Sequence, residues 1–218
     1  MPTIVTEKSE ISQKHFYIEA IRPKNRILFC VTKRMIDIVA ATIGLLTLAI
    51  PMIVIAIAIK IDSRGPVIFK QERLGKDGVP FVMYKFRSMY TDAEKNGPQW
   101  AEKIDWRCTR VGRVLRKTRL DEIPQLLNIL RGDMSLVGPR PERAVFYDQF
   151  ETYIHGFRNR LVVRPGLTGL AQVNGGYDLR PEEKIIYDME YIQNQSLRMD
   201  LTCLLKTIRL IFTHEGAR

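Results

Sequence analysis

The chain of 218 residues has few of the residues that build metal sites and disulfide frameworks. Its three cysteines, Cys30, Cys108 and Cys203, lie far apart, and no cluster of histidines accompanies any of them. Zinc sites and disulfide-stapled domains need closer or paired spacings, so we expect neither. The pattern favours a reducing, cytosolic setting.

Several other signatures are missing from the sequence. There is no glycine-rich phosphate loop, no dinucleotide-binding fingerprint, no internal repeat and no low-complexity tract. The first thirty or so residues contain no apolar core, which argues against a signal peptide. We expect residues 1–32 to form an N-terminal arm that is extended or partly ordered.

The charge balance is strongly basic and points to polyanionic partners. The formal net charge is +10, and 45% of the residues are apolar, which is enough for a folded core. Such a charge suits nucleic acid, anionic lipid headgroups or phosphorylated ligands. We expect no nucleic acid, because the aromatic residues form no stacking stripe and no nucleic-acid motif is present.

One long segment is free of charge. Residues 38–59 contain no charged side chain and consist mainly of Ile, Ala, Leu and Val. As a helix this run would be about 33 Å long, enough to cross a bilayer. A buried helix of a soluble core is the alternative, although such helices are seldom apolar all round.

The residues around and inside this run favour a bent, re-entrant membrane helix over residues 33–62. Basic residues stand on both sides of it, which would keep both flanks on the cytoplasmic face. Pro51 removes the hydrogen bond to the Thr47 carbonyl and marks the expected break. The Thr47 hydroxyl can satisfy polar groups near that break. A single kinked span is the alternative.

Residues 63–218 are expected to form a cytoplasmic catalytic domain of mixed α/β structure with a short sheet. Residues 66–73 and 80–89 read as two strands of a hairpin around a turn at 75–78. Lys85 and Arg87 alternate on the second strand, so both point to one face, either into solvent or toward a shared anion. The chain lacks the regular strand–helix alternation of a doubly wound sheet.

A dense group of cations leads into an Asp-Glu pair. Residues 107–119 contain six basic side chains, and Asp121 and Glu122 follow. Apolar residues then recur at helical spacing up to Gly132, which places Asp121 near the N-cap of a helix. Cations and helix dipole favour ionised carboxylates, while mutual repulsion opposes them.

This pair has two interpretations. An ionised Asp121 can act as a nucleophile, and Asp121 and Glu122 together can hold Mg²⁺ through oxygen ligands. The alternative is that Asp121 only caps the helix and Glu122 lies in its first turn.

Two rigid Arg-Pro elements follow. Arg140 stands between Pro139 and Pro141, and Arg164 precedes Pro165 in a glycine-containing segment. Fixed guanidinium groups suit bidentate phosphate binding, and glycines let backbone N–H groups approach a ligand.

Two helices are expected near the C-terminus. Residues 182–195 carry one apolar face, which indicates core packing. Residues 201–211 alternate apolar residues with Lys206 and Arg209. That pattern fits an interfacial amphipathic helix or an ordinary helix packed on the domain.

Together these segments resemble the bacterial sugar transferases, the monotopic phosphoglycosyl transferases in their compact form. The resemblance covers the chain from about Lys33 to its end. Its carriers, in order, are residues 63–66 (SRGP), 85–89 (KFRSM), 120–125 (LDEIPQ), 131–135 (RGDMS), 138–141 (GPRP), 164–169 (RPGLTG) and 171–174 (AQVN). The family often has Ser-Pro at the helix break, whereas this chain has Ile50 before Pro51.

The resemblance implies a re-entrant helix at the cytoplasmic face of the bacterial inner membrane and a catalytic pair, Asp121 and Glu122, with Mg²⁺. It implies a UDP-sugar donor, a polyprenyl-phosphate acceptor, release of UMP and an aspartyl-phosphosugar intermediate. Membrane lipids and a second copy of the chain are the other expected partners. The candidate substrate- and phosphate-binding residues are Lys85, Arg87, Arg119, Arg140, Arg164, Gln172 and Asn174. A lipid- or glycan-binding module without chemistry is the alternative function.

Overall fold

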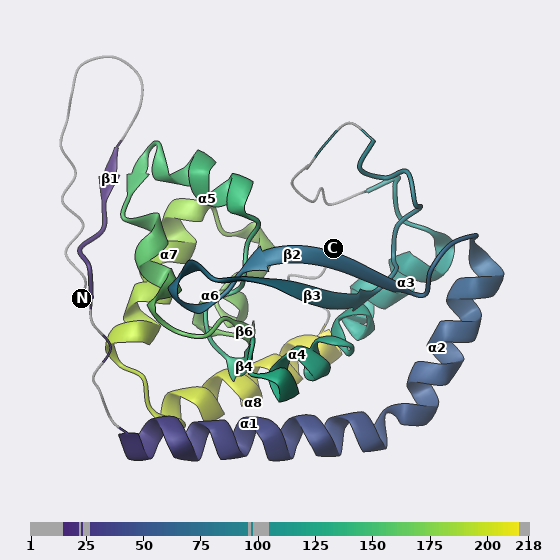
Figure 1. Cartoon of the computed structure of the whole chain (residues 1–218), viewed down its shortest axis with the longest axis horizontal. Coiled ribbons are helices and arrows are strands. Elements are labelled where there is room, and N and C mark those ends of the chain that lie inside the picture. The colour runs from purple at the N-terminus through teal and green to yellow at the C-terminus, as the bar shows by residue number, and fades with distance from the viewer. Residues whose placement is uncertain (1–14, 22, 24–26, 96, 98–104, 214–218) are drawn as a thin grey trace.

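A bent pair of helices packs against the rest of the molecule. The computed structural model describes residues 15–21, 23, 27–95, 97 and 105–213. Helix α1 (Ile27–Thr47) runs along one side of the molecule, and α2 (Ala49–Asp62) turns away from its end by 61° (Figure 1). Within the described residues no single helix is long and apolar enough to cross a membrane. The two helices of the bent pair, taken together, have the required length and composition.

The bend lies slightly before the expected break. Leu48 separates the two helices, and Pro51 lies in the first turn of α2, where its missing N–H is tolerated. The Thr47 hydroxyl donates to the carbonyls of Ile43 (2.9 Å) and Gly44 (3.2 Å), as expected for a polar group near a break. Helix α1 begins at Ile27 rather than at residue 33, so residues 27–32 are helical and not part of the arm. Most of the predicted arm, residues 1–32, lies outside the described residues.

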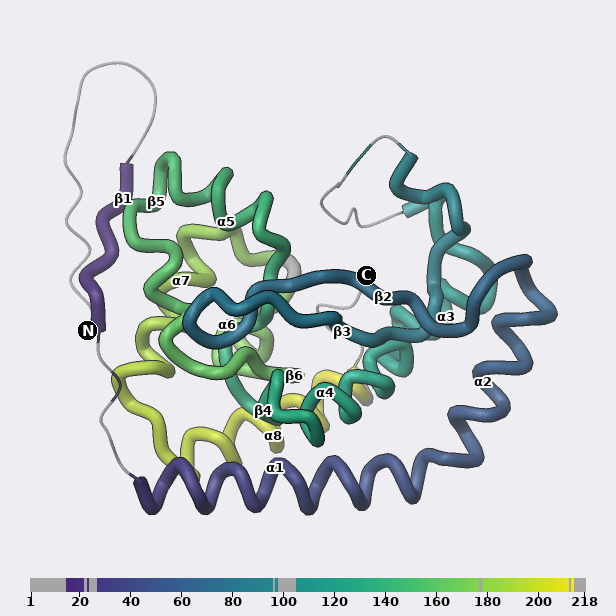
Figure 2. The backbone as a smooth tube through the Cα atoms, in the orientation of Figure 1, coloured from purple at the N-terminus to yellow at the C-terminus, as the bar shows by residue number. Residues whose placement is uncertain are grey.

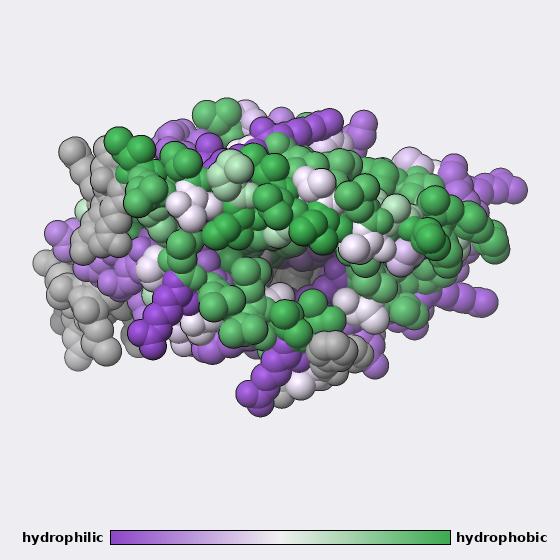
Figure 3. All heavy atoms as spheres, turned by 90° about the horizontal axis from the view of Figure 1, so that it is seen from below, coloured by the Kyte–Doolittle hydropathy of each residue, from purple (hydrophilic) through white to green (hydrophobic). Residues whose placement is uncertain are grey.

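Large apolar side chains cover the outer face of this helix pair. Figure 3 shows this face, seen from below, as a nearly continuous apolar surface. Its most exposed members include Leu28, Leu46, Ile50 and Ile61, the last 82% exposed. An apolar surface of this extent is unusual for a monomeric soluble protein and marks an interaction face.

Buried polar contacts fasten α1 to the domain. The Asp37 carboxylate is buried and accepts hydrogen bonds from the Ser135 hydroxyl (3.1 Å) and the Leu136 backbone N–H (3.0 Å). One helix turn earlier, Lys33 forms an ion pair with Asp200 at 2.6 Å. These contacts fix the rotation of α1, because each buried group would lose its partner if the helix turned.

Arg34 adds a third contact of this kind. Its guanidinium donates to the carbonyls of Ile129 (2.6 Å) and Leu130 (2.9 Å), in the last turn of α4 (Gln125–Arg131). A cation at this position satisfies carbonyls that have no partner within the helix.

Among the described residues, the domain contains three small two-stranded sheets. The predicted hairpin is confirmed: β2 (Ile68–Leu74) pairs antiparallel with β3 (Pro80–Phe86) around a 3₁₀ turn, η1 (Lys76–Gly78). In Figure 2, β4 (Ser135–Val137) lies beside β6 (Gly166–Thr168), with which it pairs in parallel, and β1 (Phe16–Tyr17) pairs in parallel with β5 (Ile154–His155). The fold is mixed α/β, as predicted.

The remaining helices pack around two apolar clusters. One cluster lies around α7 (Pro181–Gln193), α5 (Ala144–Glu151) and the 3₁₀ segment η3 (Phe157–Val162). The other joins α1 and α2 to β3, α3 (Arg110–Thr118) and α4. Ile185, Met189 and Ile192 of α7 are buried, which confirms the predicted core face.

Helix α8 (Leu197–Thr213) buries one face and exposes apolar side chains on another. Cys203 faces the core and is fully buried, so the helix packs on the domain. Leu201, Leu205 and Ile208 point outward and are each more than half exposed. The short helix α6 (Leu170–Val173) and the 3₁₀ turn η4 (Gly176–Asp178) complete this part of the chain.

A substitution at Gly112 can test how closely α3 packs against the chain just after the hairpin. A Cβ at this position would lie 1.9 Å from the Ser88 carbonyl oxygen, a backbone atom that cannot rotate away. We predict that Gly112→Ala lowers the free energy of unfolding by about 1–3 kcal/mol, measured by denaturant titration followed by circular dichroism. Val114→Ala, in the same helix on its exposed side, serves as the control and should change it by less than about 0.5 kcal/mol. Equal effects of the two substitutions would contradict this packing.

Candidate active site

The Asp-Glu pair lies in a tight turn rather than at a helix N-cap. Helix α3 ends at Thr118, its C-cap Arg119 has a left-handed backbone (φ 58°), and the 3₁₀ turn η2 (Leu120–Glu122) follows at once. Helix α4 then begins with Pro124 as its N-cap, so Asp121 lies near the helix start, as predicted, but does not itself cap the helix. The left-handed turn at Arg119 redirects the chain and directs both carboxylates inward.

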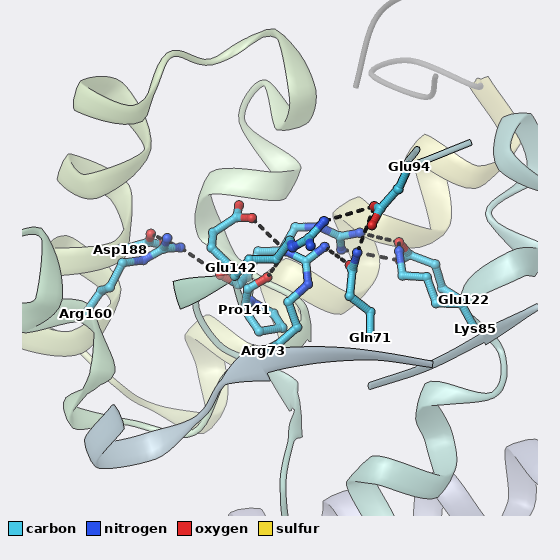
Figure 4. Close-up of polar contacts among 11 residues, drawn as sticks. Gln71, Arg73, Lys85, Glu94, Glu122, Pro141, Glu142, Arg160 and Asp188 are labelled. Carbon is cyan, nitrogen blue, oxygen red and sulfur yellow. Dashed lines mark hydrogen bonds and ion pairs between the residues drawn. The ribbon is translucent and has the colours of Figure 1, made fainter. Parts of the chain in front are cut away.

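Two cations from separate elements hold Glu122. Lys85 of β3 donates to its carboxylate at 2.9 Å, and the Arg140 guanidinium donates to both of its oxygens. Burial alone would raise the pKa of Glu122, but Arg140 and Lys85 outweigh burial and lower it well below its usual range. Figure 4 shows Lys85 and Glu122 facing one another beside strand β2. Glu122 is therefore an ionised, fixed part of the site.

Asp121 has the opposite character. Its side chain is buried, and burial is the main reason that its pKa rises to about 6. Lys85 acts against this increase, while the neighbouring charge of Glu122 adds to it. At neutral pH Asp121 is mostly ionised but far more basic than an ordinary aspartate, which suits a nucleophile or a proton acceptor.

Both carboxylates line a cavity rich in cations. The cavity has a volume of about 730 Å³, within the range of sites for drug-sized or nucleotide-sized ligands. Arginine and lysine side chains from the hairpin, α3, the 138–143 loop, η3 and α7 surround it. The basic residues on its wall are Lys70, Arg73, Lys85, Arg87, Arg107, Arg116, Arg119, Arg140, Arg143, Arg160 and Lys184. Such a wall suits a ligand that carries several negative charges.

A buried ion pair supports the loop that carries Arg140. Arg160 pairs with Asp188 at 2.6 Å, and both side chains are almost completely buried. The same Nη2 atom of Arg160 also donates a hydrogen bond to the Arg140 backbone carbonyl (3.0 Å). Arg73 of β2 pairs with Glu142 of the same loop at 3.0 Å. Figure 4 shows this support extending from Asp188 past Glu142 and Arg73 toward Glu122.

Sequence reasoning missed this support. Arg160 and Asp188 stand 28 positions apart on different elements, and neither belongs to a recognisable motif. Arg73 falls within a predicted strand, where a solvated cation is the ordinary expectation. The sequence shows the prolines on either side of Arg140, but the partners that fix this loop come from distant segments and depend on tertiary structure.

The structure brings some of the predicted binding residues together and not others. Arg119, Arg140 and Gln172 line the cavity with Lys85. The buried Gln172 amide has neither a donor nor an acceptor partner among the described residues, so it can accept and donate to a ligand. Arg164 and Asn174 lie off the cavity wall; Arg164 donates to the Gly132 carbonyl and Asn174 to the Leu170 carbonyl.

Arg87 occupies a different position from that expected of a phosphate ligand. Part of its side chain reaches the cavity wall, but its guanidinium donates to the carbonyls of Ser63 (2.6 Å) and Arg64 (2.9 Å). A further bond reaches the Ile59 carbonyl (3.3 Å), so the group caps the C-terminal end of α2. This geometry gives Arg87 a structural task at the exit of the helix pair.

The family of the chain follows from comparison with known proteins. The family model described as "Bacterial sugar transferase" matches residues 28–214, and the chain belongs to this family. It is 47% identical over 194 residues to a UDP-N-acetylgalactosamine-undecaprenyl-phosphate N-acetylgalactosaminephosphotransferase of Aeromonas hydrophila, covering 88% of this chain and 46% of that protein. It is 42% identical over 200 residues to a UDP-glucose:undecaprenyl-phosphate glucose-1-phosphate transferase of Caulobacter vibrioides, covering 89% of this chain and 75% of that protein.

A further relative is similar in size to the matched region. The chain is 48% identical over 160 residues to a putative undecaprenyl-phosphate N-acetylgalactosaminyl 1-phosphate transferase of Bacillus subtilis, covering 71% of this chain and 89% of that protein. The chain thus spans about half the length of the Aeromonas protein and most of the Bacillus protein. Relatives that differ in the sugar they are named for share similar identity with this chain.

The coupling between the two carboxylates can be measured directly. We predict that Glu122→Gln moves the Asp121 titration from about pH 6 to lower pH, because it removes a neighbouring negative charge and frees Lys85 and Arg140 to stabilise the Asp121 anion. Carbon-13 NMR of labelled aspartate carboxyls would follow the titration, with Asp121→Asn used to assign the signal. Glu94→Gln, at a carboxylate 41% exposed on the cavity rim, is the matched control and should leave the midpoint near 6. An upward shift with Glu122→Gln would contradict the proposed coupling.

Proposed function

We propose that this protein transfers a sugar-1-phosphate from a UDP-sugar to undecaprenyl phosphate, with release of UMP, as the first membrane step of surface glycan assembly. The observation that carries the proposal is the contrast between its two carboxylates. Asp121 is buried and has a raised pKa, whereas Glu122 is ionised and its charge is balanced by Lys85 and Arg140. The names of the relatives support the reaction class and the two substrates.

The contrast assigns a role to each carboxylate. An oxygen of the Asp121 carboxylate attacks the phosphorus that bears the sugar, the bond from that phosphorus to the UMP oxygen breaks, and UMP leaves. A phosphate oxygen of the lipid then attacks the same phosphorus and returns Asp121 to its ionised form. Glu122 is unsuited to the attack, because its oxygens are already engaged by Lys85 and Arg140. It positions these two cations instead.

The cations of the cavity offset the charge that develops during the transfer. Breaking the diphosphate places negative charge on the UMP oxygen, and fixed guanidinium groups stabilise such charge most when they are already in place. Arg116, Arg119 and Arg140 lie on the wall beside Asp121. The support of Arg140 by Arg160 and Asp188 gives it this pre-organisation.

The residues present are compatible with Mg²⁺. Mg²⁺ is commonly bound by one or two carboxylates together with substrate phosphates and water, so it does not need a cluster of three acidic side chains. No such cluster occurs among the described residues. Asp121 would be the principal ligand and Glu122 a secondary one, since its oxygens are paired. When bound, Mg²⁺ would neutralise charge on the diphosphate.

The helix pair is the proposed membrane anchor. Its exposed apolar side chains, the 61° bend and basic residues at both ends support a re-entrant helix with both ends on the cytoplasmic face. The outward apolar residues of α8 support an interfacial position for that helix. Such an arrangement would bring the lipid phosphate and a water-soluble nucleotide-sugar to the same cavity.

The reaction can be tested by quantifying UMP from purified protein supplied with Mg²⁺, undecaprenyl phosphate and a panel of UDP-sugars. We predict that Asp121→Asn reduces UMP release by at least about a thousand-fold, because the nucleophile is removed. Asp148→Asn, at an exposed carboxylate, is the control and should retain full activity. A phosphosugar adduct on the peptide containing Asp121 should appear in mass spectra when the lipid is omitted. UMP release by Asp121→Asn at the normal rate would rule out the covalent route.

The topology can be tested with cysteine labelling. We predict that Cys30, which is exposed near the start of α1, and a cysteine introduced by Arg64→Cys after α2 both react with an impermeant maleimide in inside-out vesicles. Neither should react in intact spheroplasts, because a re-entrant helix leaves both ends on one face. Buried Cys108 and Cys203 can be replaced by serine to simplify the labelling. Reaction of the two sites from opposite sides would indicate a single kinked span.

A further inference from the structure

Helix α3 carries a row of cations on the face that points away from the protein. Arg110, Arg113 and Lys117 recur at intervals of three and four residues and are all exposed. Val114, 60% exposed, lies on the same face. We call these four residues the basic stripe. None of them lines the cavity that contains Asp121, so the stripe is separate from the proposed active site.

The opposite face of α3 fixes the stripe beside the end of α2. Val111 and Leu115 pack in the apolar cluster that contains Ile55 and Ile59 of α2. The Asp62 carboxylate, at the last residue of α2, accepts a hydrogen bond from the Val111 backbone N–H (3.1 Å). The stripe therefore stays close to the point where the apolar helix pair ends.

The cations of the stripe have no acidic partner within the described part of the chain. No ion pair or hydrogen bond joins Arg110, Arg113 or Lys117 to a carboxylate there, and the same holds for Lys60 and Arg64 at the end of α2. Other cations nearby, such as Arg107, are paired with acids. Like charges three and four residues apart on a helix repel one another, so an external anion would relieve the repulsion.

Apolar side chains adjoin this group of cations. Ile57 and Ile61 of α2 are 55% and 82% exposed, and Val114 interrupts the stripe itself. In Figure 3 hydrophilic side chains border the apolar surface at the end of the molecule that α2 forms. Exposed apolar residues next to unpaired cations are the arrangement of a segment that lies at a bilayer surface, with its cations among lipid phosphates.

We propose that the basic stripe, with Lys60 and Arg64, binds the headgroups of anionic phospholipids. The inference rests on the proposed insertion of α1 and α2, and it adds a contact with the leaflet surface outside the cavity. Anionic leaflets attract clustered lysines and arginines near their surface. Because α3 leads directly through Arg119 to the η2 turn, this contact would set the height of Asp121 relative to the lipid phosphates.

The test measures vesicle binding by the full chain without a UDP-sugar. Undecaprenyl phosphate is added to phosphatidylcholine vesicles in one separate arm only. Protein diluted from detergent is floated with vesicles of phosphatidylcholine alone, or with about 30% phosphatidylglycerol, at low and high NaCl. We expect a preference of about ten-fold or more for the anionic vesicles at low salt, largely lost at about 0.5 M NaCl. The triple variant R110Q/R113Q/K117Q should lose most of this preference and bind phosphatidylcholine vesicles as the unmodified protein does.

A matched triple variant controls for net charge. K76Q/K95Q/R158Q removes the same formal charge from exposed residues elsewhere and should keep the preference. Folding of each variant is checked by circular dichroism.

An unmodified protein that shows no preference for anionic vesicles, or a stripe variant that retains this preference in full, would overturn the proposal. A stripe-dependent preference that requires undecaprenyl phosphate in phosphatidylcholine vesicles, and does not occur with phosphatidylglycerol, would also overturn it in favour of an acceptor site. Because UMP is not measured, failure here leaves the transferase proposal standing, and the reverse also holds.

Discussion

The burial of two adjacent carboxylates is the constraint on which the rest of this structure depends. Placing Asp121 and Glu122 together out of water is costly unless cations are held close to them. Lys85 comes from the hairpin and Arg140 from a loop more than fifty residues away, so the chain must bring three distant segments to one point. Arg160 and Asp188 then fix the loop from behind. Much of the domain serves to place charges around a single turn.

A second constraint links this turn to the apolar helix pair. Apolar packing alone would let α1 rotate or slide, because most of its side chains are apolar. Asp37, Lys33 and Arg34 remove that freedom, because each binds a particular polar group of the domain. At the other end, Arg87 and Asp62 join the exit of α2 to β3 and α3. The position of the carboxylates relative to the apolar surface is thus set at both ends of the bent pair.

The parts of the fold that depend on local pattern could be predicted from the sequence. The uncharged run, the proline near the bend, the hairpin and the apolar face of α7 each follow from spacing within one segment. The errors occurred where tertiary structure overrides such spacing. The periodicity from Ile123 to Leu130 indicated a helix with Asp121 at or near its N-cap, whereas Asp121 lies in the 3₁₀ turn that precedes α4. Nothing in the local sequence distinguishes Arg140, which faces the carboxylates, from Arg164, which faces the Gly132 carbonyl.

Arg87 illustrates why the pattern of charges in the sequence is not enough to identify a phosphate-binding residue. Arg87 stands two residues from Lys85, and alternation would place both on one face of the strand. The strand ends at Phe86, however, and the chain there is free to turn the Arg87 guanidinium toward three carbonyls at the end of α2. Helix C-termini have unsatisfied acceptors and therefore compete with ligands for nearby cations. In this molecule the cations therefore have two tasks: Lys85 and Arg140 hold a carboxylate, and Arg87 holds the end of the helix that carries the apolar surface.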